Sequence, residues 1–409
     1  MQKKPELLAP AGNFEKLKYA LHYGADAVYC AGKRFGLRAK SDNFDKEELA
    51  EAVQYVHARG KKIYITLNMI PHNDDLDGLE AYAKELEALG VDGVLIADPG
   101  VFAIVKQAAP GLKISISTQA NNTNWASACF WHDQGARRIV LARELGLDEI
   151  KAIVDKTPED MEIETFVHGA MCISYSGRCL LSHYMTGRNS NQGDCAHPCR
   201  WKYHLIEATR PEEDFQIEED DTGSFIFNSK DLCLINEIPK LMAAGVDSFK
   251  IEGRMKSLYY VATVVSVYRR VIDLCFNNPD MDEVPSEYFE ELRKVSHRNY
   301  TTGFFNHKTT GDDQNYGTSS YTRLYDFVGV VQSYDPDTQI AVIEQRNKIT
   351  AGDTIEVMTP QGYFVQQAEV ITDMDDQPIE ATPHAKMLYK MKMAQPVAFM
   401  DILRKQENQ

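Results

Sequence analysis

Short apolar stretches alternate with longer amphipathic stretches over the first two thirds of the chain, and this alternation predicts strands separated by helices. The expected helices cover Phe14–Tyr23, Leu76–Leu89 and Tyr259–Phe276, and another begins near Asp45. Eight strands are expected, at Leu7–Ala9, Ala27–Cys30, Lys62–Leu67, Gly93–Ala97, Lys113–Ser117, Arg138–Leu141, Glu162–Val167 and Ser248–Ile251. Eight such units fit an α/β fold, the closed, TIM-barrel-like (β/α)8 barrel. An open, doubly wound sheet is the alternative, and no glycine-rich phosphate loop in the sequence favours it.

Polar side chains recur at every second position of several expected strands. Residues two apart in a strand share a face, so each of these strands has one apolar and one polar face. The polar faces hold Tyr64, Thr66 and Asn68; Ser115, Ser117 and Gln119; Glu162, Glu164, Phe166 and His168; and Lys250 and Glu252. If the apolar faces lie under the helices, the polar faces point into the barrel and form a polar binding cavity. The alternative is an internal network of Lys, Glu and hydroxyl groups that only fills the barrel.

The last quarter of the chain has a different pattern, with short alternating stretches separated by turns. Four strands are expected there, at Phe327–Gln332, Ile340–Glu344, Thr354–Met358 and Phe364–Thr372. They predict a small all-β barrel domain over residues 320–405, after a TIM-barrel-like domain over residues 1–315. Residues 172–247 interrupt the barrel as an insertion after the seventh strand. The small domain serves either as a docking or nucleic-acid module or as a stabilising appendage.

Composition and charge narrow the class of protein. The chain has 409 residues, of which 44% are hydrophobic and 25% charged, as in ordinary globular proteins. No apolar run has the length of a membrane span, and the N-terminal residues show no secretory signal, so we expect a cytoplasmic protein without a membrane partner. The net charge of −16 argues against non-specific coating of nucleic acid. Binding of nucleic acid would therefore require a local basic surface.

Four of the eight cysteines cluster directly after the seventh expected strand, where a barrel of this kind places its chemistry. Cys172, Cys179, Cys195 and Cys199 follow the spacing C-x6-C-x15-C-x3-C. Four thiolates can hold a structural zinc ion or an iron–sulfur cluster, and the spacing alone does not decide between the two. Four structural thiols without a metal are the third reading. Disulfides are not expected in a cytoplasmic protein.

The segment Glu164–Ser182, which reads ETFVHGAMCISYSGRCLLS, resembles the defining motif of peptidase family U32, the collagenase-like peptidases. The resemblance extends over nearly the whole chain, through Leu8–Gly12, Gly24–Tyr29, Phe35–Ala39, Phe249–Lys256 and Arg298–Gly303. Within the family the chain is most similar to bacterial proteins that hydroxylate the wobble uridine of tRNA in a prephenate-dependent reaction. The resemblance implies a 4Fe–4S cluster on Cys172, Cys179, Cys195 and Cys199, prephenate as co-substrate and the tRNA anticodon loop as partner. Whether a partner subunit of the same family is required stays open.

Proteolysis, which the family name suggests, is the alternative activity, and a metal-stabilised scaffold without turnover is a third. The sequence contains neither an H-E-x-x-H zinc motif nor a G-x-S-x-G nucleophile elbow. Cys172 could act as a nucleophile with His168 as its base, but a thiolate bound to iron cannot also attack a peptide. The residues therefore give peptidase activity little support.

The hydroxylation hypothesis assigns roles to specific residues. Guanidinium groups suit a dicarboxylate such as prephenate, and the candidates for binding it are Arg34, Arg38, Arg143 and Arg254, with Lys250 and Glu252 in the cavity. For each arginine, a surface or phosphate-binding role is the alternative. Glu164 and His168 are the candidates for proton transfer, the alternative being a core histidine and a Glu164–Lys250 pair. The nucleic-acid candidates flank the cysteines together with Tyr184 and Trp201, and they are Arg178, Arg188, Arg200 and Lys202.

Overall fold

A computed structural model describes most of the chain: residues 3–36, 42–172, 174–175, 178–201, 219–220, 223–224, 229–307 and 324–407. Arg38, Lys202 and the expected domain boundary near residues 310–320 lie outside these residues, as does the side chain of Arg200. Within the described ranges, no helix has the length and apolar character needed to cross a membrane.

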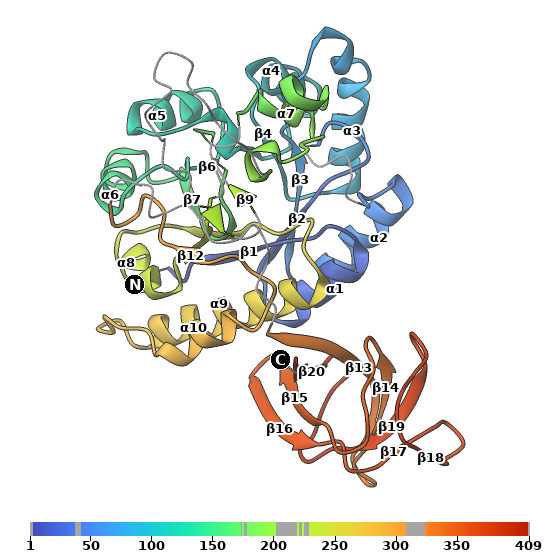
Figure 1. Cartoon of the computed structure of the whole chain (residues 1–409). Coiled ribbons are helices and arrows are strands. Elements are labelled where there is room, and N and C mark those ends of the chain that lie inside the picture. The colour runs from blue at the N-terminus through green and yellow to red at the C-terminus, as the bar shows by residue number, and fades with distance from the viewer. Residues whose placement is uncertain are drawn as a thin grey trace.

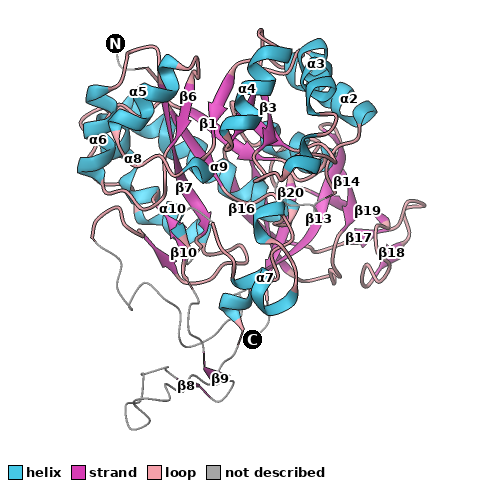
Figure 2. Cartoon of the chain, turned by 90° about the horizontal axis from the view of Figure 1, so that it is seen from above, coloured by secondary structure: helices cyan, strands magenta, loops and turns pink. Residues whose placement is uncertain are grey.

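Eight parallel strands form a closed barrel, as predicted, and β11 pairs with both β1 and β7 to close it. The barrel strands are β1 (Glu6–Pro10), β2 (Ala27–Cys30), β3 (Lys62–Leu67), β4 (Gly93–Ile96), β5 (Ile114–Ile116), β6 (Arg138–Val140), β7 (Glu162–Ala170) and β11 (Ser248–Ile251). Figure 1 shows the helices around these strands, with α9 along the side that faces the C-terminal domain. Figure 2 shows the same barrel from above, with α2, α3, α5 and α6 outside the strands.

The helices begin at capping residues that the sequence supplies. The side chain of Asn13 accepts a hydrogen bond from the amide of Lys16, and Asp45 forms a capping box with Glu48. The expected helix over 76–89 is wrong at its start: α3 begins only at Leu79, because Gly78 has a left-handed conformation with φ of 81°. The helices are α1 (Phe14–His22), α2 (Lys46–His57), α3 (Leu79–Leu89), α4 (Pro99–Ala108), α5 (Trp125–Asp133), α6 (Leu147–Lys156), α7 (Leu181–Thr186), α8 (Ile238–Ala243), α9 (Leu258–Asn277) and α10 (Ser286–Leu292).

Strand β7 is longer than the sequence predicts, and it has three partners. Its first part pairs with β6 and β11 inside the barrel. Its last residues pair antiparallel with β10 (Asp231–Cys233), which in turn pairs with β12 (Tyr300–Thr301). The insertion after β7 thus returns to the barrel through β10, and it also carries the two-stranded sheet of β8 (Glu219–Asp220) and β9 (Gly223–Ser224).

The C-terminal domain is an eight-stranded antiparallel sheet around its own apolar core. Five of its strands correspond to the four expected stretches, because the last stretch divides into β16 and β17. The short β18 and the longer β19 and β20 were not expected. The strands are β13 (Tyr325–Asp335), β14 (Ile340–Gln345), β15 (Thr354–Thr359), β16 (Gly362–Gln367), β17 (Ile371–Thr372), β18 (Pro378–Ile379), β19 (Leu388–Lys392) and β20 (Ile402–Gln406).

The two domains are joined by buried polar contacts. The hydroxyl of Tyr23 in α1 donates a hydrogen bond of 3.0 Å to the carbonyl of Met358 in β15. The guanidinium of Arg404, which is fully buried in β20, lies 2.5 Å from Glu291 of α10 and 2.7 Å from Glu356 of β15. A buried charge of this kind is stable only while its partners stay in place, so these contacts fix the C-terminal domain against the barrel.

Candidate active site

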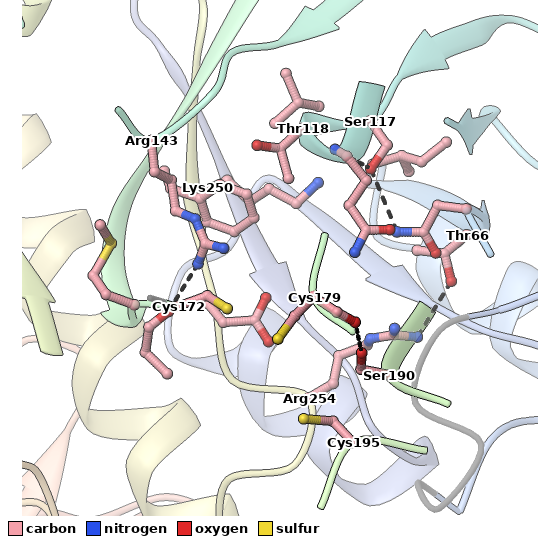
Figure 3. Close-up of a pocket in the computed structure, with 18 of the residues that line it drawn as sticks. Thr66, Ser117, Thr118, Arg143, Cys172, Cys179, Ser190, Cys195, Lys250 and Arg254 are labelled. Carbon is pink, nitrogen blue, oxygen red and sulfur yellow. Dashed lines mark hydrogen bonds between the residues drawn. The ribbon is translucent and has the colours of Figure 1, made fainter. Parts of the chain in front are cut away.

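A cavity of about 150 Å³ lies at the carboxyl ends of the barrel strands. Residues of β3, β5, β7 and β11, or residues directly after these strands, line it together with the cysteine loop. This is the end at which barrels of this type carry their active sites. Figure 3 shows the cavity with Lys250 and Arg143 on one side and Cys179 and Cys195 on another. The expected polar face of the strands thus faces open space here, at Thr66, Asn68, Ser117 and Gln119.

All four clustered cysteines line this cavity. Cys172 follows the end of β7 and Cys179 precedes α7, while Cys195 lies in the loop after α7 and Cys199 in a short 3-10 helix over Pro198–Arg200. Each is half-buried, and the described cysteines form no disulfide bond. Four thiols that are separated by up to 27 positions in the sequence therefore reach one space inside the protein.

The surroundings of two sulfurs suit thiolates. The amide of Leu181 donates a hydrogen bond of 3.4 Å to Cys179 Sγ, and the amide of His197 donates one of 3.3 Å to Cys195 Sγ. Hydrogen bonds to cysteine sulfur are a means by which proteins tune iron–sulfur clusters. As the side chains stand, no group of three or more His, Cys, Asp or Glu residues in the described ranges is arranged to hold a metal ion. The donor set therefore suits a metal or cluster in its chemistry, and the four sulfurs would have to converge to hold one.

Three cations and one carboxylate share the cavity with the cysteines: Arg143, Lys250, Arg254 and Glu252. Arg143 Nη1 donates 2.8 Å to the carbonyl of Ala170, and the guanidinium lies over the ring of Phe166. Arg254 is almost fully buried and donates 3.2 Å to the hydroxyl of Thr66. The three cations exceed the one carboxylate by two positive charges, so the lining favours an anionic ligand.

Glu164 does not line the cavity but lies in the floor of the barrel below it. Its carboxylate accepts hydrogen bonds from Lys250 and Arg138, both at 2.9 Å, and from Ser248 at 3.0 Å. Burial alone would raise the pKa of this carboxyl, but Lys250 and Arg138 hold the pKa below its usual range. Glu164 thus forms the pair with Lys250 that was the alternative to direct proton transfer.

The expectation that His168 points into the barrel is wrong. Between Lys250 and Ile251 the pairing of β11 with β7 shifts, so that one step along β11 spans two steps along β7. Beyond this bulge the order of inward- and outward-facing side chains along β7 is reversed relative to β11. His168 therefore points outward, away from the barrel interior. Its Nδ1 lies 3.3 Å from the hydroxyl of Tyr268 in α9, and burial lowers its pKa to about 3. A neutral histidine behind the sheet cannot transfer a proton in the cavity.

The other predicted residues lie at different places. Arg34 is exposed, donates a hydrogen bond to the carbonyl of Asp77 and does not line the cavity, so the structure does not bring it to the predicted anion site. Arg178 is exposed and donates 2.8 Å to the carbonyl of Gln119, a cavity residue. Arg188 binds Asp194 at 3.0 Å and the carbonyl of Cys195 at 3.2 Å. The two described nucleic-acid candidates therefore lie beside the cavity.

Sequence reasoning missed two residues that organise this site. Arg138 binds Glu6, Glu162 and Glu164 in the floor, and Tyr29 donates 2.9 Å to the carbonyl of Ile251 and lies under the ammonium of Lys250. A charged residue at the start of the apolar strand β6 was a usable signal, because a lone charge in a barrel strand needs partners inside the barrel. Tyr29 carried no comparable signal in its short apolar strand.

Comparison with known proteins agrees with this architecture. The model of peptidase family U32 matches residues 12–315, and the model of the family's C-terminal domain matches residues 323–404. tRNA hydroxylation protein P1 of Bacillus subtilis is 45% identical over 98% of this chain and 95% of its own length. tRNA hydroxylation protein P of Escherichia coli is 39% identical over 88% of this chain and 87% of its own length. An uncharacterized protease of Methanocaldococcus jannaschii is 39% identical over 86% of each chain. The chain belongs to peptidase family U32.

Proposed function

We propose that this protein hydroxylates tRNA, and more specifically that it converts the wobble uridine to 5-hydroxyuridine in a prephenate-dependent reaction that uses an iron–sulfur cluster. The single observation that carries the proposal is that the four cysteines and the three cations line one cavity at the carboxyl ends of the strands. Similarity to tRNA hydroxylation proteins over nearly the full length supports the substrate class.

Cys172, Cys179, Cys195 and Cys199 would hold the cluster, because they are the thiols that line the cavity. Such a cluster supplies one-electron redox chemistry when it is bound. The hydrogen bonds from the amides of Leu181 and His197 stabilise the thiolate form of two of the ligands. A zinc ion on the same thiols is the alternative to the cluster.

The cations of the cavity would bind and orient prephenate. This co-substrate carries two carboxylates, and the guanidinium groups of Arg143 and Arg254 suit carboxylates in shape and charge. Lys250 adds a third positive charge, and Glu252 limits the excess. The neutral groups of Thr66, Asn68, Ser117 and Gln119 form the remaining polar wall, against which an uncharged base can form hydrogen bonds.

The tRNA would approach the cavity over the cysteine loop. A base in a structured loop must leave its stack to enter a pocket, and exposed aromatic rings can receive unstacked bases. Tyr184 of α7 is 85% exposed, and Trp201 is 42% exposed. Arg178 and Arg188 lie beside the cavity and offer positive charge to the phosphates, although the chain as a whole is acidic.

Proteolysis stays the second candidate only by family name and by the protease relative. The nucleophile–base pair that proteolysis would use is Cys172 with His168. Cys172 lines the cavity, but His168 is buried on the other side of β7. This separation removes the geometric basis of that pair.

Nucleoside analysis of tRNA from a deletion strain tests the proposal. We expect 5-hydroxyuridine to disappear in the strain and to return with the wild-type chain but not with Cys195→Ser. The matched control is Cys129→Ser, since Cys129 is also half-buried but does not line the cavity. Purified wild-type protein should absorb broadly near ~400 nm, and Cys195→Ser should lose this absorption. Undiminished 5-hydroxyuridine in a strain without paralogues would refute the proposed function.

A further inference from the structure

The ammonium group of Lys250 connects the cavity with the charged floor of the barrel. Lys250 lines the cavity but is only 3% exposed, and its Nζ lies 2.9 Å from Glu164 Oε1 and 4.4 Å from the ring centre of Tyr29. Glu164 is itself completely buried and has no access to the cavity. Any effect of Glu164 on a ligand must therefore act through another side chain.

Two opposing effects decide whether Lys250 carries its charge. The pKa of Lys250 lies below its usual value, because burial and Arg138 lower it by more than Glu164 and Glu252 raise it. Glu164 is in direct contact with Nζ, through both a hydrogen bond and an ion pair. The rings of Tyr29 and Phe166, at 4.4 and 5.5 Å from Nζ, also favour the charged form. Without Glu164, fewer groups would raise the pKa of Lys250, so burial would lower this pKa further.

Glu164 is in turn kept ionised by the floor. Arg138 binds Glu164 at 2.9 Å, Glu6 at 2.7 Å and Glu162 at 2.6 Å, so its charge is shared among three carboxylates. Ser248 donates a further hydrogen bond to Glu164. The floor thus places a fixed negative charge next to Nζ of Lys250, whose side chain lines the cavity.

We propose that Glu164 is a positioning residue that keeps Lys250 protonated and directed into the cavity, where Lys250 binds a carboxylate of the anionic co-substrate. This inference rests on the proposed function for the identity of that co-substrate. It replaces direct proton transfer by Glu164 with an action through Lys250. The inference also explains why a buried carboxylate lies below a site that suits an anion. The carboxylate keeps the buried lysine protonated, although its own negative charge reduces the positive potential of the cavity.

The test compares two carboxylates that both bind Arg138. Glu164→Gln removes the charge next to Lys250, whereas Glu162→Gln removes a charge that contacts Arg138 but not Lys250. The affinity of each purified protein for prephenate is measured by calorimetry between pH 6.5 and 8.5. We expect a flat profile for the wild type and for Glu162→Gln. For Glu164→Gln we expect the affinity to fall about tenfold for each pH unit above the lowered pKa of Lys250.

A rescue experiment separates the charge of Lys250 from a general defect of the fold. Arginine keeps its charge at these pH values, so Glu164→Gln combined with Lys250→Arg should give a flat profile again. Glu164→Asp keeps the charge but moves it away from Nζ, and it should give an intermediate profile even if Glu164→Gln does not fold. A folded Glu164→Gln protein with a flat profile, or a Glu164→Asp profile identical to that of the wild type, would overturn the inference alone. A wild type that binds no prephenate at any of these pH values would overturn the proposed co-substrate together with it.

Discussion

The two ends of the barrel interior use the same kinds of side chain for different purposes. In the floor, Glu6, Glu162 and Glu164 surround Arg138, and each of these groups has an ionic partner within 2.9 Å. At the mouth, Arg143 and Arg254 line open space beside the cysteines. Arg143 makes one hydrogen bond to a carbonyl, and its buried Nε has no hydrogen-bond partner within the described residues.

The difference shows how to distinguish a structural network from a binding site when both are ionic. Buried charges that pair with one another have no capacity left to bind a ligand, and removal of one of them leaves its partners unpaired. Charges that are held by backbone carbonyls or hydroxyls beside a cavity keep part of their capacity for a ligand. Lys250 belongs to both regions, because it pairs with Glu164 of the floor and also lines the cavity at the mouth.

The largest expected effect of a substitution lies in the floor. Arg138→Ala leaves the buried carboxylate of Glu164 without one of its two cations, and we expect a loss of about 3–5 kcal/mol in the free energy of unfolding. Arg137→Ala is the matched control, since Arg137 pairs with Asp160 at the surface and should change stability by no more than about 1 kcal/mol. Chemical denaturation measures both. Equal losses in the two variants would contradict the structural role of the floor.

A smaller effect, on the affinity for the ligand and not on stability, is expected at the mouth of the barrel. Arg143→Ala should reduce the affinity for prephenate about 10- to 100-fold, as the loss of a charged hydrogen-bond donor does, and leave the denaturation midpoint nearly unchanged. Arg34→Ala is the control, because Arg34 is an arginine outside the cavity. Calorimetric titration provides the affinities. A large loss of stability in Arg143→Ala with unchanged affinity for prephenate would show that the cations at the mouth form a second structural network and not a binding site.

The smallest expected effect lies at the rim. Tyr184→Ala removes an exposed ring from α7, so the stability should not change, while the affinity for tRNA should fall about fivefold through the loss of one stacking contact. Phe130→Ala is the comparison, since Phe130 is similarly apolar and 56% exposed but belongs to α5. Filter binding at fixed salt concentration measures both variants. An equal decrease in tRNA affinity for the two variants would show that the rim is not part of the tRNA-binding surface.

The barrel could be predicted from the sequence because its signals are local. Strand and helix stretches alternate, and polar residues repeat at every second position in β3, β5 and β11. That parity correctly indicated Thr66, Asn68, Ser117, Gln119, Lys250 and Glu252 as residues that face the interior. The cysteine positions followed from their spacing and from the place of the loop after β7.

The position of His168 could not be predicted, because it depends on the register between two strands that lie about 80 residues apart in the sequence. A bulge changes which face a residue occupies without any change in the composition of the strand. The pairing of the insertion strand β10 with β7 is likewise non-local. The functional assignments of the cysteines, of the cations and of the RNA-binding residues stay predictions.

Arg404 restricts how far the C-terminal domain can move relative to the barrel. Because its buried guanidinium in β20 pairs with Glu291 of α10, the C-terminal sheet cannot swing away from the barrel without leaving buried charges unpaired. Movement of the C-terminal sheet relative to the barrel is therefore coupled to the breaking of the Arg404–Glu291 ion pair.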